Sequence, residues 1–419
     1  MGVKFDNTFK LSVAALNLNR GHPSLPLNLK WAAQMFLLYV GFSPNFLGFL
    51  YSSIFHDDFP KICRNLSEAL VFNIICINNA ILIVYKKKIN DMIKITEENI
   101  ESSKKLSSED ELVVKEYTEK GNKAAKVWLA VCIIAGGVLP GKAIVGSSYL
   151  SLQGNLTLVP IYDVTWPAYV DDRKNEFYMY LIIFGFQSFY IICICLMFVA
   201  FYPLGPIFML QACGQIELVI RKLGRLFKDD NIDSDETVKS LQDIARHVQD
   251  IYRYVSIRNK KFNLYVFTTC LGCTRTVILF LSFVDIIQKT HTALYEMCLK
   301  TTTFLIPLSL IGFVESYNQG NANIQLICFV CASGMQCYIP CYYCELLATK
   351  GEELRYAIYG CGWERHWVPK TRSTILVMLT RTAHPLGINA VFCMVGMAAF
   401  ANVCNLAYSI FNVMNAAWN

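Results

Sequence analysis

KTRSTILVMLTRTAHPLGINAVFCMVGMAAFANVCNLAYSIFNVMNAAWN, residues 370–419, decides the fold class of this chain. Its first part is a basic amphipathic segment, which ends at Pro385 and Gly387 because proline and glycine together interrupt a helix. Residues 388–414 follow without a charge and are largely apolar. Since about 20 apolar residues cross a bilayer as a helix, we expect a final transmembrane helix over residues 388–414.

Four polar residues interrupt this apolar run at helical spacing. They are Asn402, Asn405, Ser409 and Asn412. Their intervals of three and four residues place them on one face of a helix. Polar side chains are costly in lipid and turn toward protein or water. The stripe therefore indicates either the lining of a pore or hydrogen bonding to neighbouring helices.

The composition of the whole chain is that of a polytopic membrane protein. Of its 419 residues, 54% are hydrophobic and 17% are charged, and the mean hydropathy is +0.37. Few soluble domains combine so much apolar surface with so little charge. Residues 1–10 lack the apolar core of a signal peptide, so we expect the first membrane span itself to direct insertion.

Seven apolar stretches are long enough to be predicted as membrane-spanning helices. They are residues 31–54, 66–85, 127–145, 177–210, 264–287, 324–347 and 388–414. The fourth exceeds the thickness of a bilayer, so we expect it to tilt or to project into the cytosol. Residues 303–314 are apolar but better suit a cap or an interfacial piece. If they crossed the membrane, there would be eight spans and the C-terminus would change sides.

The distribution of lysine and arginine sets the expected orientation. Of the 38 basic residues, 30 lie in residues 1–30, 86–126, 221–261 and 350–381, all on one side of the predicted membrane. The positive-inside rule places that side in the cytosol, so the N-terminus is inside and the C-terminus outside. This orientation is the reverse of that of G-protein-coupled receptors. The net charge of +6 reflects these loops and does not indicate nucleic-acid binding.

A glycine-rich pattern resembles a nucleotide-binding loop but favours a structural interpretation. Residues 136–142 match GxxxxGK, yet Ala143 replaces the Ser or Thr that would hold magnesium. We expect these glycines to permit close helix contact or to leave room for a ligand.

Cysteine pairs at CxxC spacing have a structural interpretation as well. They are Cys270 and Cys273, Cys328 and Cys331, and Cys341 and Cys344. All lie in predicted spans, where cysteine behaves as a small hydrophobic residue rather than a zinc ligand. Together with the absence of a catalytic triad or paired carboxylates in the sequence, this predicts no metal site, no cofactor and no enzyme activity.

Two Asn-x-Ser/Thr triplets differ in their expected accessibility. Asn155 lies in the loop between the third and fourth spans, which the charge pattern places outside, and is a predicted glycosylation site. Asn65 borders the second span and lies too near the membrane for efficient modification.

The residues of the last fifth of the chain resemble those of an insect odorant receptor, as a tuning member of that family. The motifs are Glu345-Leu346-Leu347, the run from Glu352 to Tyr359, Trp363, Leu379-Thr380-Arg381, Pro385-Leu386 and the run from Ala407 to Phe411. Tyr180, Gln187 and the HVQDIYRYV segment of the second cytosolic stretch also fit. Seven spans with a cytosolic N-terminus agree with the resemblance independently.

The resemblance implies an odorant-gated, non-selective cation channel. Such a channel is an all-α tetramer around a central pore that the four last helices line, with Phe411 at the position of an apolar gate. Cytosolic extensions, here residues 214–257, 346–367 and 370–381, hold the subunits together in an anchor domain. The implied partners are an odorant co-receptor subunit or further copies of this chain, a small volatile ligand and membrane lipid, and the implied location is the plasma membrane of an olfactory neuron.

In this family the ligand pocket lies in the outer half of one subunit, among the second, third, fourth and sixth helices. On this chain, that half contains Phe72, Asn73, Cys76, Gly137, Ile144, Tyr149, Phe177, Tyr180, Phe184, Gln187, Phe329 and Met335. Aromatic and aliphatic walls with few polar groups suit a volatile apolar ligand. Ordinary helix packing is the alternative role for each of these residues.

The expected organisation follows from the resemblance and the spans. Residues 1–213 form the N-terminal tail and the first four helices, 214–261 a cytosolic helical segment, 262–348 the fifth and sixth helices, 349–385 the anchor helices and 386–419 the pore helix. Two alternatives remain, a gustatory-type receptor channel and a small-molecule transporter. A transporter is expected to show internal repeats and intramembrane carboxylates, and Asp285 is taken as the one acidic residue close to a span interior.

Overall fold

The computed structural model describes residues 4–55, 59–84, 86–154, 158–162, 168–227, 234–269, 314, 324–365, 368–384, 386, 388–389 and 394–418. Within these ranges the chain is almost entirely helical, as predicted. Most of the predicted fifth span, the segment 289–323 apart from residue 314, Asp285 and Asn155 lie outside the described residues.

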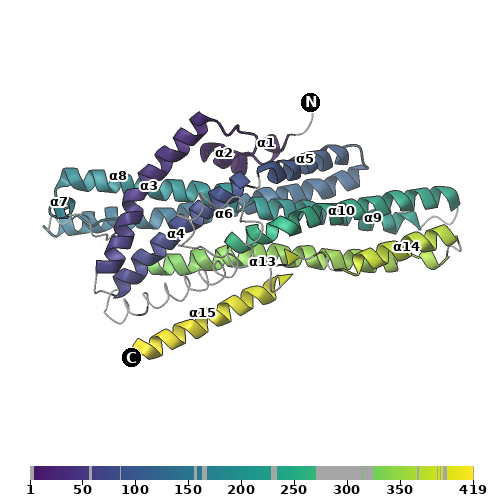
Figure 1. The fold of residues 1–419 in the computed structure, drawn as a ribbon. Coiled ribbons are helices and arrows are strands. Elements are labelled where there is room, and N and C mark those ends of the chain that lie inside the picture. Colours follow the sequence, from purple (N-terminus) through teal and green to yellow (C-terminus); the bar gives the residue numbers. More distant parts are fainter. Residues whose placement is uncertain are drawn as a thin grey trace.

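The helices run mainly along one axis and form an elongated bundle (Figure 1). They are α1 (Phe5–Thr8), α2 (Lys10–Leu18), α3 (Leu29–Phe55), α4 (Phe59–Val84), α5 (Lys86–Ser103), α6 (Ser108–Leu152), α7 (Ala168–Asp171), α8 (Phe177–Phe201), α9 (Leu204–Leu226), α10 (Ser234–Thr269), α13 (Ile324–Tyr359), α14 (Pro369–Thr382) and α15 (Met397–Trp418), with a 3-10 turn η2 (Trp363–Arg365). Strands β1 (Ile388–Asn389) and β2 (Met394–Val395) form a short antiparallel pair.

Three helical stretches in the described part of the chain are long and apolar enough to cross a membrane. They are Leu29–Tyr51, Ser108–Leu152 and Phe177–Leu226, and the shorter apolar stretch Met397–Val413 lies in α15. The predicted first span, residues 31–54, overlaps the stretch Leu29–Tyr51 closely. The predicted third span, residues 127–145, lies inside the stretch Ser108–Leu152. The predicted second and sixth spans lie in α4 and α13.

The helices of the bundle extend well beyond the predicted spans. Helix α6 begins at a serine cap, Ser107, whose side chain accepts a hydrogen bond from the amide of Asp110, and it continues for 45 residues. The predicted fourth span continues as helix to Leu226, with a break at Tyr202 and Pro203 that divides it into α8 and α9. Helix α13 is continuous from the predicted sixth span to Tyr359, so the helical continuation of that span is present to that residue.

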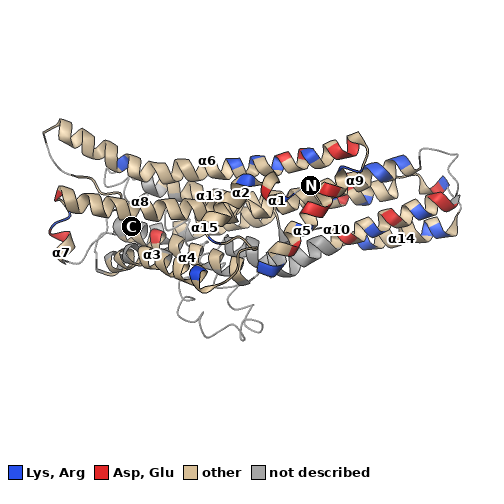
Figure 2. Cartoon of the chain, turned by 90° about the horizontal axis from the view of Figure 1, so that it is seen from above, with Lys and Arg blue, Asp and Glu red and all other residues tan. Residues whose placement is uncertain are grey.

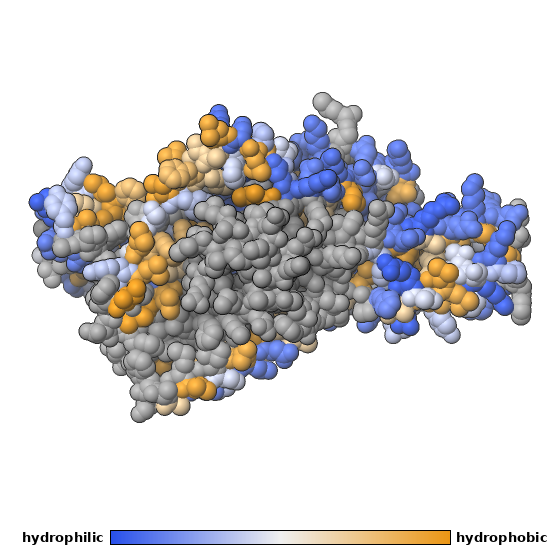
Figure 3. All heavy atoms as spheres, in the orientation of Figure 1, coloured by the Kyte–Doolittle hydropathy of each residue, from blue (hydrophilic) through white to orange (hydrophobic). Residues whose placement is uncertain are grey.

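Charge divides the bundle along its length. Figure 2 shows lysine, arginine, aspartate and glutamate gathered on α5, α9, α10, α14 and the first half of α6, while α8 and the second half of α6 carry few charges. The space-filling view in Figure 3 shows the same division, with hydrophilic atoms at the end that α10 and α14 occupy. This charged end corresponds to the predicted cytosolic side, and the C-terminus of α15 lies toward the opposite end (Figure 1).

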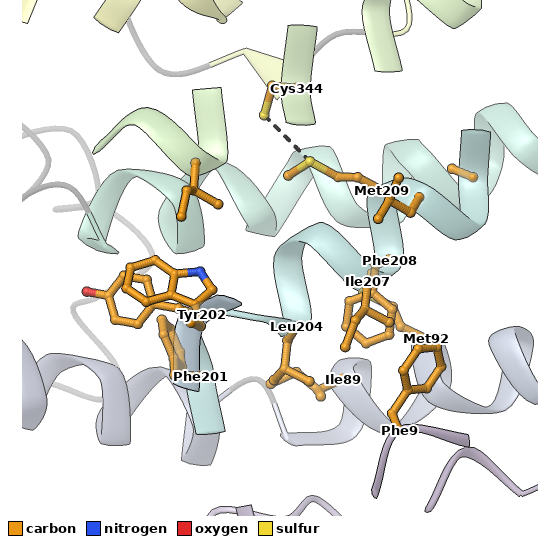
Figure 4. Close-up of a cluster of buried hydrophobic side chains, with 14 of the residues drawn as sticks. Phe9, Ile89, Met92, Phe201, Tyr202, Leu204, Ile207, Phe208, Met209 and Cys344 are labelled. Atoms are coloured by element: carbon orange, nitrogen blue, oxygen red, sulfur yellow. Dashed lines mark hydrogen bonds between the residues drawn. The ribbon is translucent and has the colours of Figure 1, made fainter. Parts of the chain in front are cut away.

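The core of the bundle centres on the break between α8 and α9. Figure 4 shows the side chains of this region, where Phe201, Leu204 and Ile207 pack toward α5 and the N-terminal segment. The N-terminal helices contribute Phe5 and Phe9, which are fully buried, and the ring of Phe5 lies 6.3 Å from that of Phe208. The N-terminal segment is therefore part of the folded bundle and not a free tail.

The charged end is held together by ion pairs between elements distant in sequence. Lys350 of α13 lies 3.0 Å from a carboxylate oxygen of Glu217 on α9. Arg225 of α9 pairs with Asp110 of α6. Because the carboxyl of Asp110 is nearly buried, this pair is less screened by solvent than a surface pair. Helices α6, α9 and α13 therefore form one connected cytosolic extension, to which α10 and α14 are packed.

The predicted final helix begins nine residues later than expected. Residues 388–389 and 394–395 are strands, with Ile388 paired to Val395, and helix α15 starts at Met397. Apolar character alone did not distinguish the strand pair from a buried helix, because both are apolar. Helix α15 has 22 residues and spans about 33 Å, which still suffices to cross a bilayer.

A buried histidine predicts how the stability of the cytosolic extension depends on pH. His247 of α10 lies 3.0 Å from the side-chain oxygen of Gln215 on α9. Burial, and secondarily the charge of Lys222, lowers the pKa of His247 to about 4, against an opposing effect of Asp250. An unfolded histidine titrates at about 6.5, so between these values the unfolded chain binds more protons than the folded protein.

We therefore expect the contribution of His247 to thermal stability to be constant above about pH 6.5 and to be lost as the pH drops toward 4. This loss amounts to about 3 kcal/mol at most. His247→Gln keeps a polar group beside Gln215 but does not titrate, so its stability is expected to fall less over the same interval. Unfolding of purified protein followed against pH measures both, and parallel curves for parent and variant would contradict the assignment.

Candidate ligand cavity and last helix

A cavity of about 110 Å³ lies among α4, α6, α8 and α13. Its walls are Glu68, Val71, Trp128, Val131, Cys132, Ala135, Gly136, Leu139, Tyr162, Ile191, Ile194, Cys195, Phe198, Tyr202, Cys328, Ala332, Ser333 and Gln336. The same four helices are those that the resemblance implies for a ligand pocket. An apolar cavity of roughly 150 Å³ holds benzene, and the space here is somewhat smaller than that.

Tyr162, in the segment 158–162, forms part of the cavity wall. Ile161 and Tyr162 of this segment are buried, although they belong to the connection between α6 and α7. The side chain of Gln187 on α8 holds Tyr162 at both backbone groups, accepting from its amide at 3.3 Å and donating to its carbonyl at 3.4 Å. The hydroxyl of Tyr180 donates to the carbonyl of Val159 at 3.1 Å. Gln187 and Tyr180, both predicted to bind ligand, therefore fasten the segment that contributes Tyr162 to the cavity wall.

A buried acidic residue in the cavity wall was missed from the sequence. Glu68 of α4 is only 2% exposed and lies within the predicted second span, so the view of Asp285 as the one acidic residue near a span interior is wrong. The carboxyl of Glu68 is a hydrogen-bond partner of the Tyr162 hydroxyl. The sequence contained the information needed to find Glu68, because an ionisable residue inside a membrane span marks a functional position by default.

The glycine pattern of α6 has a packing role at the cavity. A β-carbon on Gly136 would lie 2.6 Å from Sγ of Cys195 and 3.3 Å from Ile191 on α8, closer than atoms normally approach. Around Gly137, by contrast, a β-carbon would meet none of the described atoms within 4 Å. Gly136 thus permits the approach of α6 to α8 and lines the cavity, which matches the structural interpretation of these glycines.

Of the twelve residues predicted to bind ligand, ten have side chains that the structure describes, and none of these ten lines the cavity. Phe72 of α4 stacks on Phe46 of α3 with ring centroids 4.5 Å apart. Cys76 of α4 is a hydrogen-bond partner of Tyr39, which is also on α3. Phe184 packs beside Tyr180, and Met335 is half-buried at the core.

The remaining members of this set fall into two groups. Gly137, Ile144, Tyr149 and Phe177 are exposed on the surface of the single chain. The side chains of Asn73 and Phe329 lie outside the described part of the structure. The assignment of these twelve residues to ligand binding stays a prediction.

Helix α15 projects from the rest of the bundle with little cover (Figure 1). Asn402, Asn405, Ser409 and Asn412 are all exposed, and Phe411 is half-buried. Apolar residues on other faces are exposed as well, with Leu406 at 50%, Tyr408 at 64% and Val413 at 69%. A largely apolar helix of this length, exposed on several faces, has surface to offer to lipid and to further chains.

Helix α13 connects the cavity to the start of α15. Ser333 and Gln336 line the cavity, and two residues after Gln336 the ring of Tyr338 meets that of Phe400 on α15 at 5.5 Å, edge to face. Beyond this contact, Glu345 accepts a hydrogen bond at 3.2 Å from the backbone amide of Met397, the first residue of α15. A carboxylate at a helix N-terminus satisfies an amide that lacks a partner inside the helix and complements the helix dipole.

The glycine that precedes α15 makes this contact possible. A β-carbon on Gly396 would lie 2.4 Å from the same carboxylate oxygen of Glu345. Any larger residue at this position therefore displaces the Glu345 carboxylate from the amide of Met397. The link between α13 and the last helix depends on both residues.

Comparison with known proteins places this architecture in a family. The family model described as 7tm Odorant receptor matches residues 58–408. The chain belongs to the odorant receptor family. This family consists of membrane receptors and not of enzymes, so the match supports the odorant receptor interpretation over the gustatory-type and transporter alternatives.

Individual relatives of this odorant receptor agree with the family match. Odorant receptor 2a of Drosophila melanogaster is 28% identical over 103 residues, which are 24% of this chain and 26% of that relative. The similarity thus spans about a quarter of the curated relative. It leaves the activity and partners of the whole protein to be proposed.

Solved structures share the fold of the receptor over nearly its full length. The olfactory receptor OR5 from Machilis hrabei, in complex with eugenol, matches with a TM-score of 0.66 and 13% identity, covering 98% of this chain and 100% of the other. The structure described without this ligand matches with a TM-score of 0.60 and 14% identity over 97% and 96% of the two chains. The predicted fold, an all-helical insect olfactory receptor fold, is therefore confirmed.

Proposed function

We propose that this chain is a subunit of an odorant-gated, non-selective cation channel of the plasma membrane. The observation that carries the proposal is the exposure of α15, which in a tetramer would stand beside three equivalent helices around a central pore. Its polar stripe of Asn402, Asn405, Ser409 and Asn412 would face the aqueous path. The subunit assembles with an odorant co-receptor or with further copies of itself.

The cavity among α4, α6, α8 and α13 is the proposed ligand site. Its walls are mostly apolar, which suits a small volatile molecule that leaves water to bind. The solved relative in complex with eugenol supports a small organic molecule as the ligand. Helix α13 touches both the cavity and α15, so it provides a physical connection between ligand and pore.

Whole-cell recording tests this function directly. The chain is expressed alone and together with an insect odorant co-receptor, and a panel of small volatiles that includes eugenol is applied. We expect an evoked inward current that reverses close to zero voltage and is nearly unchanged when sodium is replaced by potassium, because a wide polar path discriminates poorly among cations. Surface-labelled protein that passes no current with any volatile, in either setting, would overturn the proposal.

The width of the cavity at Gly136 provides a prediction on ligand size. Gly136→Ala places a methyl group against Cys195 and Ile191, so it removes space from the cavity. Overpacking costs typically about 1–3 kcal/mol, and we expect a tenfold or greater rise in the half-maximal concentration of the bulkiest active ligands. Smaller ligands are expected to be affected less.

Gly141→Ala is the matched control for this experiment. It adds the same methyl group to the same helix five residues further on, where a β-carbon meets none of the described atoms within 4 Å. Its dose–response curves are expected to overlay those of the parent. Equal shifts for the two variants, or equal shifts for large and small ligands at Gly136, would contradict the placement of the cavity.

A further inference from the structure

The connection between α2 and α3 meets the end of α4 at a small recess. Arg20, Leu27 and Trp31 border the recess from this connection and the start of α3. Asn79 of α4 and Lys86 of α5 border it from the other side. The first predicted span begins and the second ends here, so the recess lies where both helices leave the membrane. The lysine and arginine pattern predicts that this side is cytosolic.

The backbone at Arg20 is held in an unusual conformation. Its φ is 55°, in the left-handed region that residues other than glycine rarely adopt. The indole N–H of Trp31 donates to the carbonyl of Arg20 at 2.9 Å, and the amide of Gly21 donates to the carbonyl of Leu16 at 2.9 Å. A β-carbon on Gly21 would lie 2.8 Å from Leu82 of α4, so this turn packs directly against that helix. Backbone strain of this kind persists only where the surrounding structure imposes it, and it is concentrated at functional sites.

The side chains at this turn carry positive charge. The ammonium of Lys86 donates to the carbonyl of Leu25, which leaves further N–H donors on the same group. The side chain of Arg20 is exposed and has no acidic partner in the described part of the chain. Asp6 lies 3.4 Å from His22, which also borders the recess, so this acidic group faces the histidine. Arg20 and Lys86 can therefore both bond an anion at the rim of the recess.

Exposed lysines and apolar side chains flank this turn. Lys30 lies in the first turn of α3 and Lys87 in the first turn of α5, and both are exposed. Leu27, Leu29 and Phe36 are exposed as well, and Phe36 lies within the first predicted span. Basic groups next to exposed apolar side chains are typical of segments at a membrane surface, where the charges meet headgroups and the apolar atoms meet acyl chains.

We propose that this turn binds the phosphate headgroup of an anionic phospholipid in the cytosolic leaflet. The recess is only about 10 Å³, the size of one water molecule, so the headgroup lies over its rim against Arg20 and Lys86. The acyl chains follow the exposed side chains of Leu29 and Phe36 into the bilayer. Clusters of lysine and arginine immediately cytosolic of a membrane helix attract phosphatidylserine and phosphoinositides by their charge.

A binding measurement on the purified full-length receptor in a non-ionic detergent tests the proposal. The probe is dioctanoyl phosphatidylinositol 4,5-bisphosphate, and its binding is followed by microscale thermophoresis. Dioctanoyl phosphatidylcholine has the same chains without the net charge, and free inositol trisphosphate has the phosphates without the chains. We expect the phosphoinositide to bind at least tenfold more tightly than either, because its binding combines the charge of the headgroup with burial of the chains.

Removal of two charges at the turn is expected to weaken this binding about thirtyfold. The variant is Arg20→Asn with Lys86→Gln, and each basic residue near an anionic headgroup contributes roughly fivefold. Asparagine is chosen because it adopts the left-handed backbone more readily than most residues. Lys239→Gln with Lys370→Gln is the matched control, since it removes two exposed charges on α10 and α14, away from the predicted spans. Its binding is expected to change less than twofold.

Three results would overturn the proposal and leave the proposed function untouched. The first is equal binding of phosphoinositide and phosphatidylcholine by the parent. The second is a loss of binding that is absent from the Arg20 and Lys86 variant or equal in the control, because the charge of the whole receptor would then attract the lipid. The third is free inositol trisphosphate that binds as tightly as the lipid, which would make the ligand a soluble phosphate.

The single variants decide the matter if the double variant does not elute as the parent does in size-exclusion chromatography. Arg20→Asn alone and Lys86→Gln alone are each expected to weaken phosphoinositide binding about fivefold. Folded single variants that both bind the phosphoinositide as the parent does would exclude this turn as the lipid site.

Discussion

Replacing Phe411 by alanine is expected to raise the current that flows without ligand. In the proposed tetramer, four copies of Phe411 form an apolar ring, and a narrow apolar constriction blocks ions by dewetting. Burial of a large apolar side chain contributes roughly 1.5–3 kcal/mol, so losing much of it from the closed ring is expected to increase the open fraction about tenfold. Basal current divided by surface-labelled protein measures the effect.

A control for this variant lies two residues further along α15. Val413 is 69% exposed and lies about 200° around the helix from Phe411, so it faces away from the ring. Val413→Ala is expected to leave basal current unchanged. In an assembly with a co-receptor the effect of Phe411→Ala is expected to be smaller, because the co-receptor supplies part of the ring. Unchanged basal current in Phe411→Ala would exclude this residue from the gate.

Removing the Glu345 carboxylate is expected to uncouple ligand binding from pore opening. Glu345→Ala deletes the bond that joins α13 to the amide of Met397, a contact comparable to a helix cap, which contributes about 1 kcal/mol. We expect the maximal evoked current to fall about fivefold at unchanged surface expression, since a shift of this size changes an equilibrium by that factor. Glu345→Gln retains an oxygen acceptor and is expected to recover part of the current.

Gly396→Ala tests the same contact from the other side. Its β-carbon would occupy the position of the Glu345 carboxylate oxygen, so it is expected to reproduce the effect of Glu345→Ala. The double variant is expected to be no worse than either single variant, because both remove one interaction. Gly334→Ala, where a β-carbon meets none of the described atoms within 4 Å, serves as control. Additive losses would show that the two residues act separately.

The sequence predicted the helices whose pattern is local. The basic amphipathic segment at residues 370–381 is α14, Pro369–Thr382, because its proline start and apolar spacing are readable within one helix. The helical continuation of the sixth span in α13 and of the fourth span into α9 follows from the same kind of local pattern. The start of α15 was missed, because the strand pair at residues 388–395 is as apolar as the helix that follows it.

The walls of the cavity depend on contacts that no local pattern contains. Which face of α6 meets α8 is set by the approach at Gly136 and Cys195, 59 positions apart in the chain. The resemblance identified the four helices and, in Tyr180 and Gln187, two residues next to the cavity, but not the segment at Tyr162 that these residues hold. Glu68 could have been found, since a single acidic residue in an apolar helix is visible in the sequence.

Reactivity of cysteines placed on α15 tests the central claim, that a volatile ligand opens a pore lined by this helix. Asn405→Cys and Asn412→Cys are treated with a water-soluble thiol reagent while a volatile evokes current, with the parent as control for its 17 native cysteines, among them the exposed Cys404 of α15. We predict that the reagent reduces the evoked current in both variants, and that it acts much more slowly when no ligand is present. An evoked current that the reagent leaves unchanged in both variants would show that ions pass elsewhere, and would contradict the account.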